Sequence, residues 1–343
     1  MAPMPLHLPG HRPLYSRGGG PVLAPPGAFS MISATPSGSN VTVTWGASSG
    51  ATSYTLKRGT SSGSYPTTVS TSATSPYVDG PLASGTYYYK AYAVNSDGTT
   101  AANNEVSASV WLNSYSCLTD GVNESFVGDT SLNASMERTN SFTWAFWVKW
   151  GGVGANPGMM YNGAGGGSGF QGIWFYKIGV TFEVQYFNNI TTGDWWAIRT
   201  SGTTFTSGVW VHIIVSYDGS NTRAGFKIAV NGADNAVTYP YGGSAALPAS
   251  TAGTVALTIG TDSGTYFGGH YDEWAFWTSN QAANIAAIYN GGVTHRLSDL
   301  ASPPSWWRRF GDGDTYPTLS QGTGSMDLTM TNMESGDIVA DVP

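Results

Sequence analysis

Two adjacent acidic residues, Asp272 and Glu273, are the first candidates for chemistry in this chain. Acid/base cleavage of a glycosidic bond needs two carboxyl groups that face each other across a cleft. Successive side chains of a strand point to opposite faces, so we expect these two not to form an acid/base pair. No E-x-D-x-E or E-x-D-x-x-E string places alternate carboxylates on one face. We therefore expect a structural role for Asp272 and no enzymatic activity.

Other catalytic patterns are equally hard to find in the sequence. None of the histidines has an HExxH spacing, and no Ser-His-Asp arrangement is evident. His212 lies mid-strand beside Trp210, which favours a structural role. The glycine-rich run 163–169 precedes an expected strand rather than a helix, so it does not indicate a phosphate-binding loop.

Sugar binding is the chemistry that the aromatic residues favour, because flat rings stack on the apolar faces of pyranose rings. Strand alternation places one of Trp195 and Trp196 outward, and Trp195 follows a Gly-Asp hairpin end. Loop-like stretches hold further tyrosines. The alternative is ordinary packing at the rim of a sandwich. The predicted glycan-binding residues are Trp195, Tyr161, Tyr239, Tyr241 and Tyr266.

The composition fits short strands joined by many turns. Of the 343 residues, 10% are charged, 41% hydrophobic and 13% aromatic, and 46 are glycine. The net charge of −7, without a basic run, argues against a nucleic-acid partner. No stretch of about 18 uninterrupted apolar residues predicts membrane insertion. The single cysteine, Cys117, is expected to be a small buried hydrophobe and excludes an intramolecular disulfide.

Residues 1–26 are rich in proline and glycine, which exclude a helix or a central strand. They are either a disordered tail or linker, or an extended arm that becomes ordered on a neighbouring subunit. The start of the chain lacks the apolar stretch of a signal peptide, so we expect synthesis in the cytosol without secretory export. The predicted partner-docking residues of the arm are Leu6, Leu8, Arg12, Leu14, Tyr15 and Arg17.

Residues 27–112 alternate with period two in short runs, which predicts a β-sandwich. The runs VTVTW, SYTLKRGTSSG, LASGTYYYKAYAVNSDG and NEVSASV resemble a bacterial-type fibronectin type III domain. This resemblance implies that Trp45 is the core tryptophan, that Tyr87 is the corner tyrosine, and that the domain acts as a spacer.

Residues 113–343 contain more strands and one short helix, which predicts a two-sheet jelly roll. In the run 142–150, alternate residues from Phe142 share one face. We expect Ser279 to cap a helix in which Ile285, Ile288 and Tyr289 share a face. The fold class is therefore all-β throughout.

The segments SFTWAFWVKW, WVHIIVSYDG, FKIAVNGA, LTIG and GHYDEWAFWTSNQAANIAAIYNGG resemble the concanavalin A-like, laminin G-like jelly roll. The related glucanases carry the carboxylate string that is missing here. Laminin G-like and pentraxin-like members often hold Ca²⁺ on loops, which makes Asp262, Asp312 and Asp314 candidate metal ligands, although turn-forming aspartates are an alternative. No other cofactor is expected.

The closing run from SWWRRFGDGD resembles the ends of laminin G-like proteins in tailed phages. We therefore expect a virion surface protein, a capsid decoration or a tail or fibre accessory. Its arm would contact other virion proteins, and its jelly roll would bind a host-surface glycan weakly. The protein would be a homo-oligomer in the particle. The alternative is a secreted, extracellular pair of carbohydrate-binding modules from a larger bacterial polysaccharide-degrading enzyme.

Overall fold

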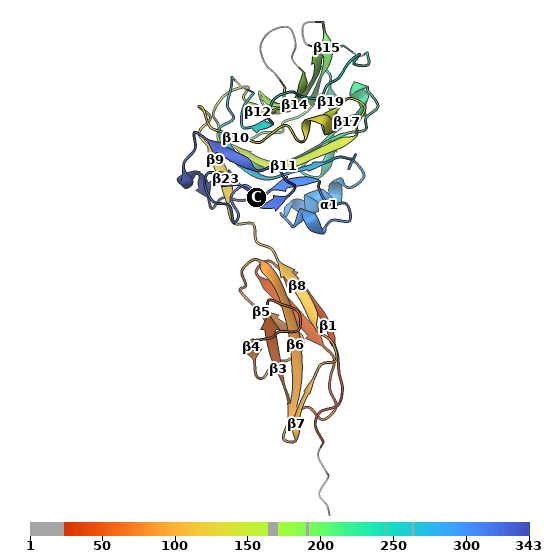
Figure 1. Ribbon diagram of the computed structural model, residues 1–343, viewed down its shortest axis with the longest axis vertical. Coiled ribbons are helices and arrows are strands. Elements are labelled where there is room, and N and C mark those ends of the chain that lie inside the picture. Colours follow the sequence, from red (N-terminus) through yellow and green to blue (C-terminus); the bar gives the residue numbers. More distant parts are fainter. Residues whose placement is uncertain (1–23, 164–170, 190–191, 244, 263) are drawn as a thin grey trace, which may run out of the picture. The chain divides into compact units, whose positions relative to one another are not determined.

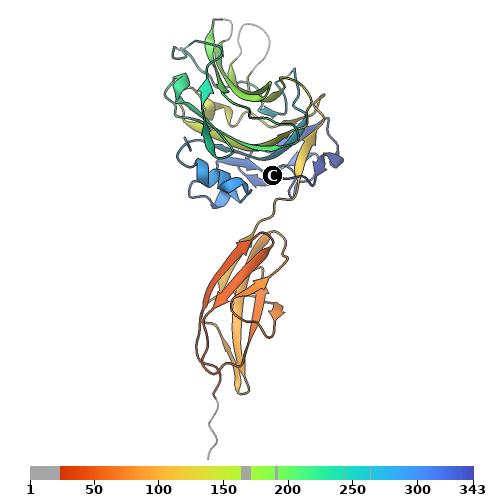
Figure 2. The same cartoon turned by 180° about the vertical axis from the view of Figure 1, so that it is seen from behind.

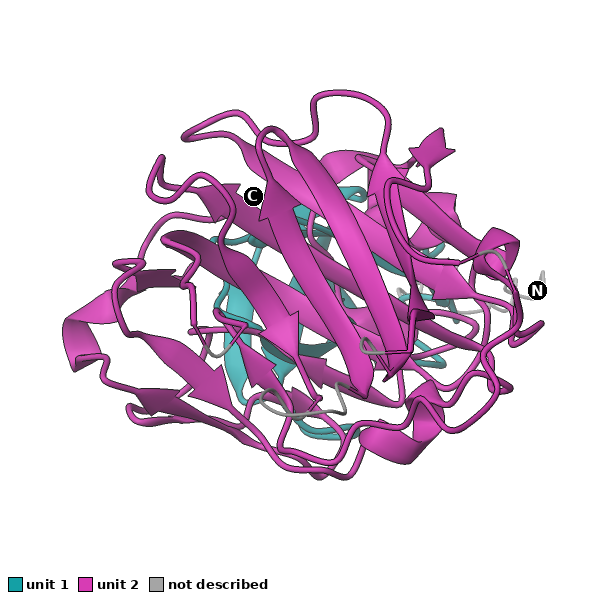
Figure 3. Ribbon diagram, turned by 90° about the horizontal axis from the view of Figure 1, so that it is seen from above, with its two compact units in different colours: residues 1–112 teal, residues 113–343 magenta. Residues whose placement is uncertain are grey.

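The chain forms two compact units, Met1–Leu112 (unit 1) and Asn113–Pro343 (unit 2), which Figure 3 colours teal and magenta. The structure is a computed structural model that describes residues 24–163, 171–189, 192–243, 245–262 and 264–343. The predicted arm residues Leu6, Leu8, Arg12, Leu14, Tyr15 and Arg17 lie outside the described residues. Within those ranges, no helix has the length and apolarity needed to cross a membrane.

Unit 1 is a sandwich of two antiparallel sheets (Figure 1). One sheet has the order β1-β2-β5, and the other has the order β4-β3-β6-β7, with β8 also paired to β6. The strands are β1 (Met31–Ser37), β2 (Asn40–Trp45), β3 (Ser53–Gly59), β4 (Thr67–Ser70), β5 (Tyr77–Asp79), β6 (Gly85–Asn95), β7 (Gly98–Ala101) and β8 (Val106–Val110).

The apolar residues that alternate along the strands of unit 1 form its core. Val41 and Val43 of β2 are fully buried, and Trp45 is 4% exposed. In β6, Tyr89, Ala91 and Ala93 face the same core from the second sheet, as the alternation predicts. Burial of one face per strand therefore determines which way each strand is turned.

Unit 2 is a sandwich of two larger antiparallel sheets, whose strands lie side by side in Figure 3. The β14 sheet runs β19 (Val237–Thr238), β15 (Asp194–Thr200), β14 (Thr181–Asn189), β13 (Gly172–Ile178), β12 (Gly158–Tyr161), β20 (Thr258–Ile259), β10 (Ser125–Val127), β25 (Leu328–Thr331) and β23 (Thr318–Leu319). The β11 sheet runs β18 (Ala233–Asn235), β17 (Phe226–Val230), β16 (Trp210–Tyr217), β11 (Phe142–Trp150), β21 (Gly269–Trp277), β22 (Trp306–Arg308) and β24 (Gly322–Thr323). In this second sheet β9 (Ser116–Thr119) pairs with β21 and with β26 (Ile338–Val339).

An aromatic core fills the space between the two sheets of unit 2. Trp144 and Phe146 of β11 are fully buried there, as their alternation predicts. Phe146 stacks on Trp274 with ring centroids 4.1 Å apart and packs against Phe175 of the β14 sheet. The fold is the predicted all-β sandwich with one short α-helix.

That helix, α1 (Ile285–Tyr289), begins later than the sequence suggested. Its N-cap residue is Asn284, and the expectation that Ser279 caps it is wrong, because the Ser279 hydroxyl accepts a bond from Gln281 Nε2 at 2.7 Å instead. The helix lies on the outer side of the β11 sheet (Figures 1 and 2), where Tyr289 stacks on Trp147. The 3₁₀ turns are η1 (Asn133–Met136), η2 (Arg223–Gly225), η3 (Asn290–Gly292), η4 (Leu297–Asp299) and η5 (Ser335–Asp337).

Candidate functional site

The outer face of the β14 sheet carries a second cluster of aromatic side chains, separate from the core. In β15, Trp196 faces the core and is fully buried, while its neighbour Trp195 points outward and is half-buried. Trp195 packs beside Phe187 of β14 and Trp174 of β13. We call this group, together with Tyr161 and Tyr241, the aromatic platform.

The accessible part of the platform is the pair Trp195 and Tyr241. The Trp195 ring lies between two others: Phe187, with centroids 5.3 Å apart and planes 16° apart, and Tyr241, at 6.2 Å and 24°. Tyr241 is 55% exposed. Its carbonyl accepts a bond from Ala197 N at 3.3 Å, which holds the loop after β19 against β15. The result is a row of three rings in which exposure increases from Phe187 through Trp195 to Tyr241.

A buried ion pair lies beside the aromatic rings on the same outer face. Glu183 of β14 is fully buried and accepts bonds from Arg199 Nε at 2.6 Å and Gln185 Nε2 at 2.5 Å. Arg199 is the cross-strand partner of Glu183, and its guanidinium lies 5.7 Å from the centroid of Tyr241. Charged and amide groups next to stacked rings are the combination that sugar recognition uses, since sugars offer both hydroxyls and apolar faces.

The structure brings together only some of the predicted glycan-binding residues. Trp195, Tyr241 and Tyr161 belong to the platform, and Tyr161 meets Trp174 edge to face at 6.2 Å. Tyr239 instead packs under Arg223, whose guanidinium carbon lies 4.4 Å from its ring centroid. Tyr266 lines a separate pocket of about 260 Å³ among the loops that hold Gly121, Asn156 and Gly264.

The three predicted metal ligands accept hydrogen bonds from backbone amides, Asp262 and Asp314 within their own loops and Asp312 from the segment before β9. Asp262 Oδ1 accepts bonds from Gly264 N and Thr265 N at 3.0 and 2.6 Å. Asp312 accepts from Ser114 N, and Asp314 accepts from Gly311 N, Ser320 N and Gln321 N. Among the residues that the structure describes, no group of three His, Cys, Asp or Glu side chains is arranged to hold a metal ion. The Ca²⁺ site stays a prediction.

The expectation that Asp272 and Glu273 point to opposite faces is wrong. The register of β21 on β11 shifts between Ala145 and Trp147, and Glu273 adopts a φ of 52° at this bulge. Burial raises the pKa of both carboxyl groups well above the ordinary values, and the charge of Glu273 raises the pKa of Asp272 further. Asn113 Nδ2 donates to Asp272 at 2.6 Å and Trp307 Nε1 donates to Glu273 at 2.5 Å. These two carboxyl groups form a buried polar centre beneath α1, with no open cleft in front of them.

A Ser-His-Asp group that the sequence did not reveal is also present. Ser116 Oγ lies 3.1 Å from His270 Nδ1, and His270 Nε2 lies 3.6 Å from Asp341 Oδ2. Ser116 is fully buried, and its hydroxyl donates to the Asp341 carbonyl at 2.5 Å. Lys149 also donates to the Asp341 carboxylate. These bonds hold the segment after β26 against the sheet. A buried hydroxyl that already donates its proton is not placed to attack a substrate, so we interpret the group as structural.

Sequence reasoning missed Trp174, Phe187, Glu183 and Arg199 as members of the candidate site. The available signal was the alternation in 172–187: once Phe182, Val184 and Tyr186 are assigned inward, Glu183, Gln185 and Phe187 must face outward.

The fold of unit 2 agrees with a family model that matches part of the chain. Residues 121–284 match Laminin_G_3 of the concanavalin A-like lectin/glucanases superfamily, so this part of unit 2 is similar to domains of that class. No curated protein matches the chain significantly.

Solved structures with a similar form include proteins of Bacteroides ovatus and Ruminococcus gnavus. A candidate carbohydrate binding protein of Bacteroides ovatus is 15% identical, with a TM-score of 0.46, over 89% of this chain and 94% of its own. The CBM40 of the Ruminococcus gnavus IT-sialidase, bound to alpha2,3 sialyllactose, is 14% identical, with a TM-score of 0.36, over 49% and 96%. These likenesses do not say what this chain binds.

Proposed function

We propose that the protein is a non-catalytic glycan-binding protein whose binding surface is the aromatic platform of unit 2. The observation that carries this proposal is the stack of Trp195 on Phe187 and Tyr241, with Arg199 beside it. Tyr241, the most exposed ring of this stack, offers area to the apolar face of a sugar at low entropic cost, and Trp195 supports it. The neighbouring Arg199 and Gln185, which the buried Glu183 holds in place, supply hydrogen-bonding groups for hydroxyls.

The setting that we propose is the surface of a tailed-phage particle, where unit 2 would provide weak adhesion to a host glycan. The support is the resemblance of the closing segment to phage laminin G-like proteins. Arm-dependent attachment to other virion proteins belongs to this proposal. Purified particles that lack the chain by mass spectrometry would contradict the setting and leave the glycan proposal standing.

For unit 1 we propose a fibronectin type III-like role as a spacer. Its strand orders, β1-β2-β5 and β4-β3-β6-β7, support this assignment. So does the hydroxyl of Tyr87, which donates to the carbonyl of Ala83 at 3.0 Å, as the corner tyrosine of such sandwiches does.

Replacing the accessible rings should remove glycan binding. We expect Trp195→Ala and Tyr241→Ala each to weaken binding to the glycans selected on an array at least tenfold, about 1.4 kcal/mol, by titration calorimetry. Tyr266→Ala is the matched control, because that tyrosine lines a separate pocket. Equal losses for all three variants, or unchanged binding after Trp195→Ala, would contradict the platform. Release of reducing ends from any polysaccharide would contradict a non-catalytic role.

A further inference from the structure

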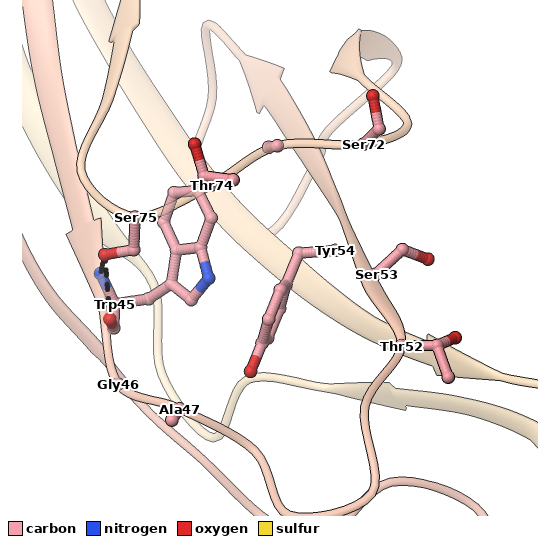
Figure 4. Close-up of a pocket in the computed structure, with 10 residues that line it drawn as sticks. Trp45, Gly46, Ala47, Thr52, Ser53, Tyr54, Ser72, Thr74 and Ser75 are labelled. Atoms are coloured by element: carbon pink, nitrogen blue, oxygen red, sulfur yellow. Dashed lines mark hydrogen bonds between the residues drawn. The ribbon is translucent and has the colours of Figure 1, made fainter.

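Unit 1 contains a pocket that its role as a spacer does not explain. The pocket has a volume of about 460 Å³ and opens where the end of β2 meets the start of β3 (Figure 4). Trp45 and Tyr54 form its aromatic walls, with ring centroids 5.8 Å apart and planes 55° apart. The other residues that line it are Gly46, Ala47, Thr52, Ser53, Ser72, Ala73, Thr74 and Ser75.

Hydrogen bonds hold the pocket open in a defined shape. The segment 72–75 runs from one sheet to the other: Ala73 N donates to the carbonyl of Tyr54 at 2.9 Å, and the Ser75 hydroxyl bonds to both N and O of Trp45 at 2.9 Å. On the opposite wall, Ser48 N donates to the Tyr54 hydroxyl at 2.6 Å. Both walls are therefore anchored to the sheets, as is usual for binding sites that exist before their ligand arrives.

One wall of the pocket carries a buried donor without an acceptor. Trp45 is 4% exposed, and the structure gives its indole Nε1 no hydrogen-bond partner. Figure 4 shows this nitrogen on the edge of the ring that faces Tyr54. Buried N–H groups are rarely left unsatisfied, because losing water without gaining an acceptor costs about 1–3 kcal/mol. Because the nitrogen is closed to solvent, a ligand oxygen would reach it only after a small shift of the Trp45 or Tyr54 ring.

The lining restricts the class of ligand. No charged side chain stands among the described residues around the pocket, so a buried ion would lack a counter-charge. Six of those residues carry hydroxyls. Thr52, Tyr54 and Ser75 use theirs within the protein, and a purely apolar ligand would leave the others unused. A neutral polyol with an apolar face satisfies both conditions, and the volume lies near the lower end of the range of small-molecule sites.

We propose that this pocket is a second binding site, which takes the terminal hexose of a neutral glycan. Trp45 and Tyr54 would contact the apolar face of the sugar, and the hydroxyls of Ser72 and Thr74 would bond to its hydroxyls. The site is independent of the platform because every residue that lines it belongs to unit 1.

The test uses the full chain carrying Trp195→Ala and Tyr241→Ala, so that the platform does not contribute. Glucose, galactose, mannose and N-acetylglucosamine are the probes, by saturation-transfer NMR and titration at millimolar concentration, and glucuronate is the charged comparison. Ala47→Trp and Thr74→Trp fill the pocket from opposite walls, and both positions are exposed, so folding should survive. Thr71→Trp is the matched control, because Thr71 is exposed on the same segment and does not line the pocket.

We expect at least one neutral hexose to bind, with glucuronate at least tenfold weaker. Each filling variant should weaken hexose binding at least tenfold, and Thr71→Trp should change it less than twofold. Absence of hexose binding, equal loss in the control, or stronger binding of glucuronate would each overturn the second site. None of these outcomes bears on the platform, whose own test is Trp195→Ala in the otherwise unchanged chain.

Discussion

Arg199→Met should destabilise unit 2 by about 2 kcal/mol. The substitution leaves Glu183 buried without its cation, and removal of one partner of a buried ion pair typically costs 3–5 kcal/mol. We expect less here because the Arg199 side chain is 22% exposed and Gln185 still donates to Glu183. Urea unfolding followed by tryptophan fluorescence measures the change.

The double variant Glu183→Gln/Arg199→Met separates stability from binding. It removes both charges, so most of the lost stability should return. Glycan binding should not return, because the guanidinium beside Tyr241 is still absent. A cost below about 0.5 kcal/mol for Arg199→Met would mean that solvent screens the pair. Full binding by the double variant would show that Arg199 has no direct role in recognition.

The strands of both units were predictable because each has one buried face. Alternation alone places Val41 and Val43 in the first core and Trp144 and Phe146 in the second. It also separates Trp195 from Trp196. In a regular strand, the face to which each side chain points follows from its position in the sequence, without information from distant residues.

Features that depend on a contact with a distant part of the chain could not be predicted from alternation. The bulge at Glu273 exists only against β11, so regular alternation assigned the wrong face. Tyr241 reaches Trp195 because its carbonyl accepts a hydrogen bond from Ala197, a contact between the loop after β19 and β15. Capping of the helix by Ser279 failed for a similar reason: the Ser279 carbonyl accepts a bond from Thr143 of a neighbouring strand, and the helix starts after Asn284.

The stability of unit 2 should fall as the pH rises through neutrality, and Glu273→Gln should remove much of that fall. The pKa values of Asp272 and Glu273 are raised well above their ordinary range in the folded state, chiefly by burial. Above about pH 4 the unfolded chain has released these protons while the folded chain retains them. More protons are then bound in the folded state, so stability decreases with pH until the folded carboxyl groups ionise, by up to about 1.4 kcal/mol per pH unit for each proton.

The charged and titratable groups around Asp272 and Glu273 determine the pH range in which this fall in stability can be measured. Arg309 lies 3.9 Å from Glu273 Oε1 and 3.3 Å from Asp312, whose own pKa burial raises. His212 lines the same small cavity as Glu273, and burial lowers its pKa to about 3. A buried neutral histidine makes stability rise with pH between about 3 and 6.5, which opposes the carboxyl effect. The window from about pH 7 to 9 therefore excludes the histidine effect. The buried Cys117 thiol, whose pKa burial also raises, adds its own fall above about pH 8.5, equally in every variant.

Within that window, Glu273→Gln should be more stable than the unchanged chain, and its stability should vary less with pH. The amide keeps the oxygen that accepts from Trp307, and its NH₂ can donate to Asp272 Oδ1, which has no partner in the described structure. Asp299→Asn, at a carboxylate that is 60% exposed, is the matched control and should leave the slope unchanged. Urea unfolding at pH 7, 8 and 9 gives the slopes. Parallel slopes for the unchanged chain and Glu273→Gln would mean that the two carboxyl groups are already ionised inside the fold, with Arg309 as a sufficient counter-charge.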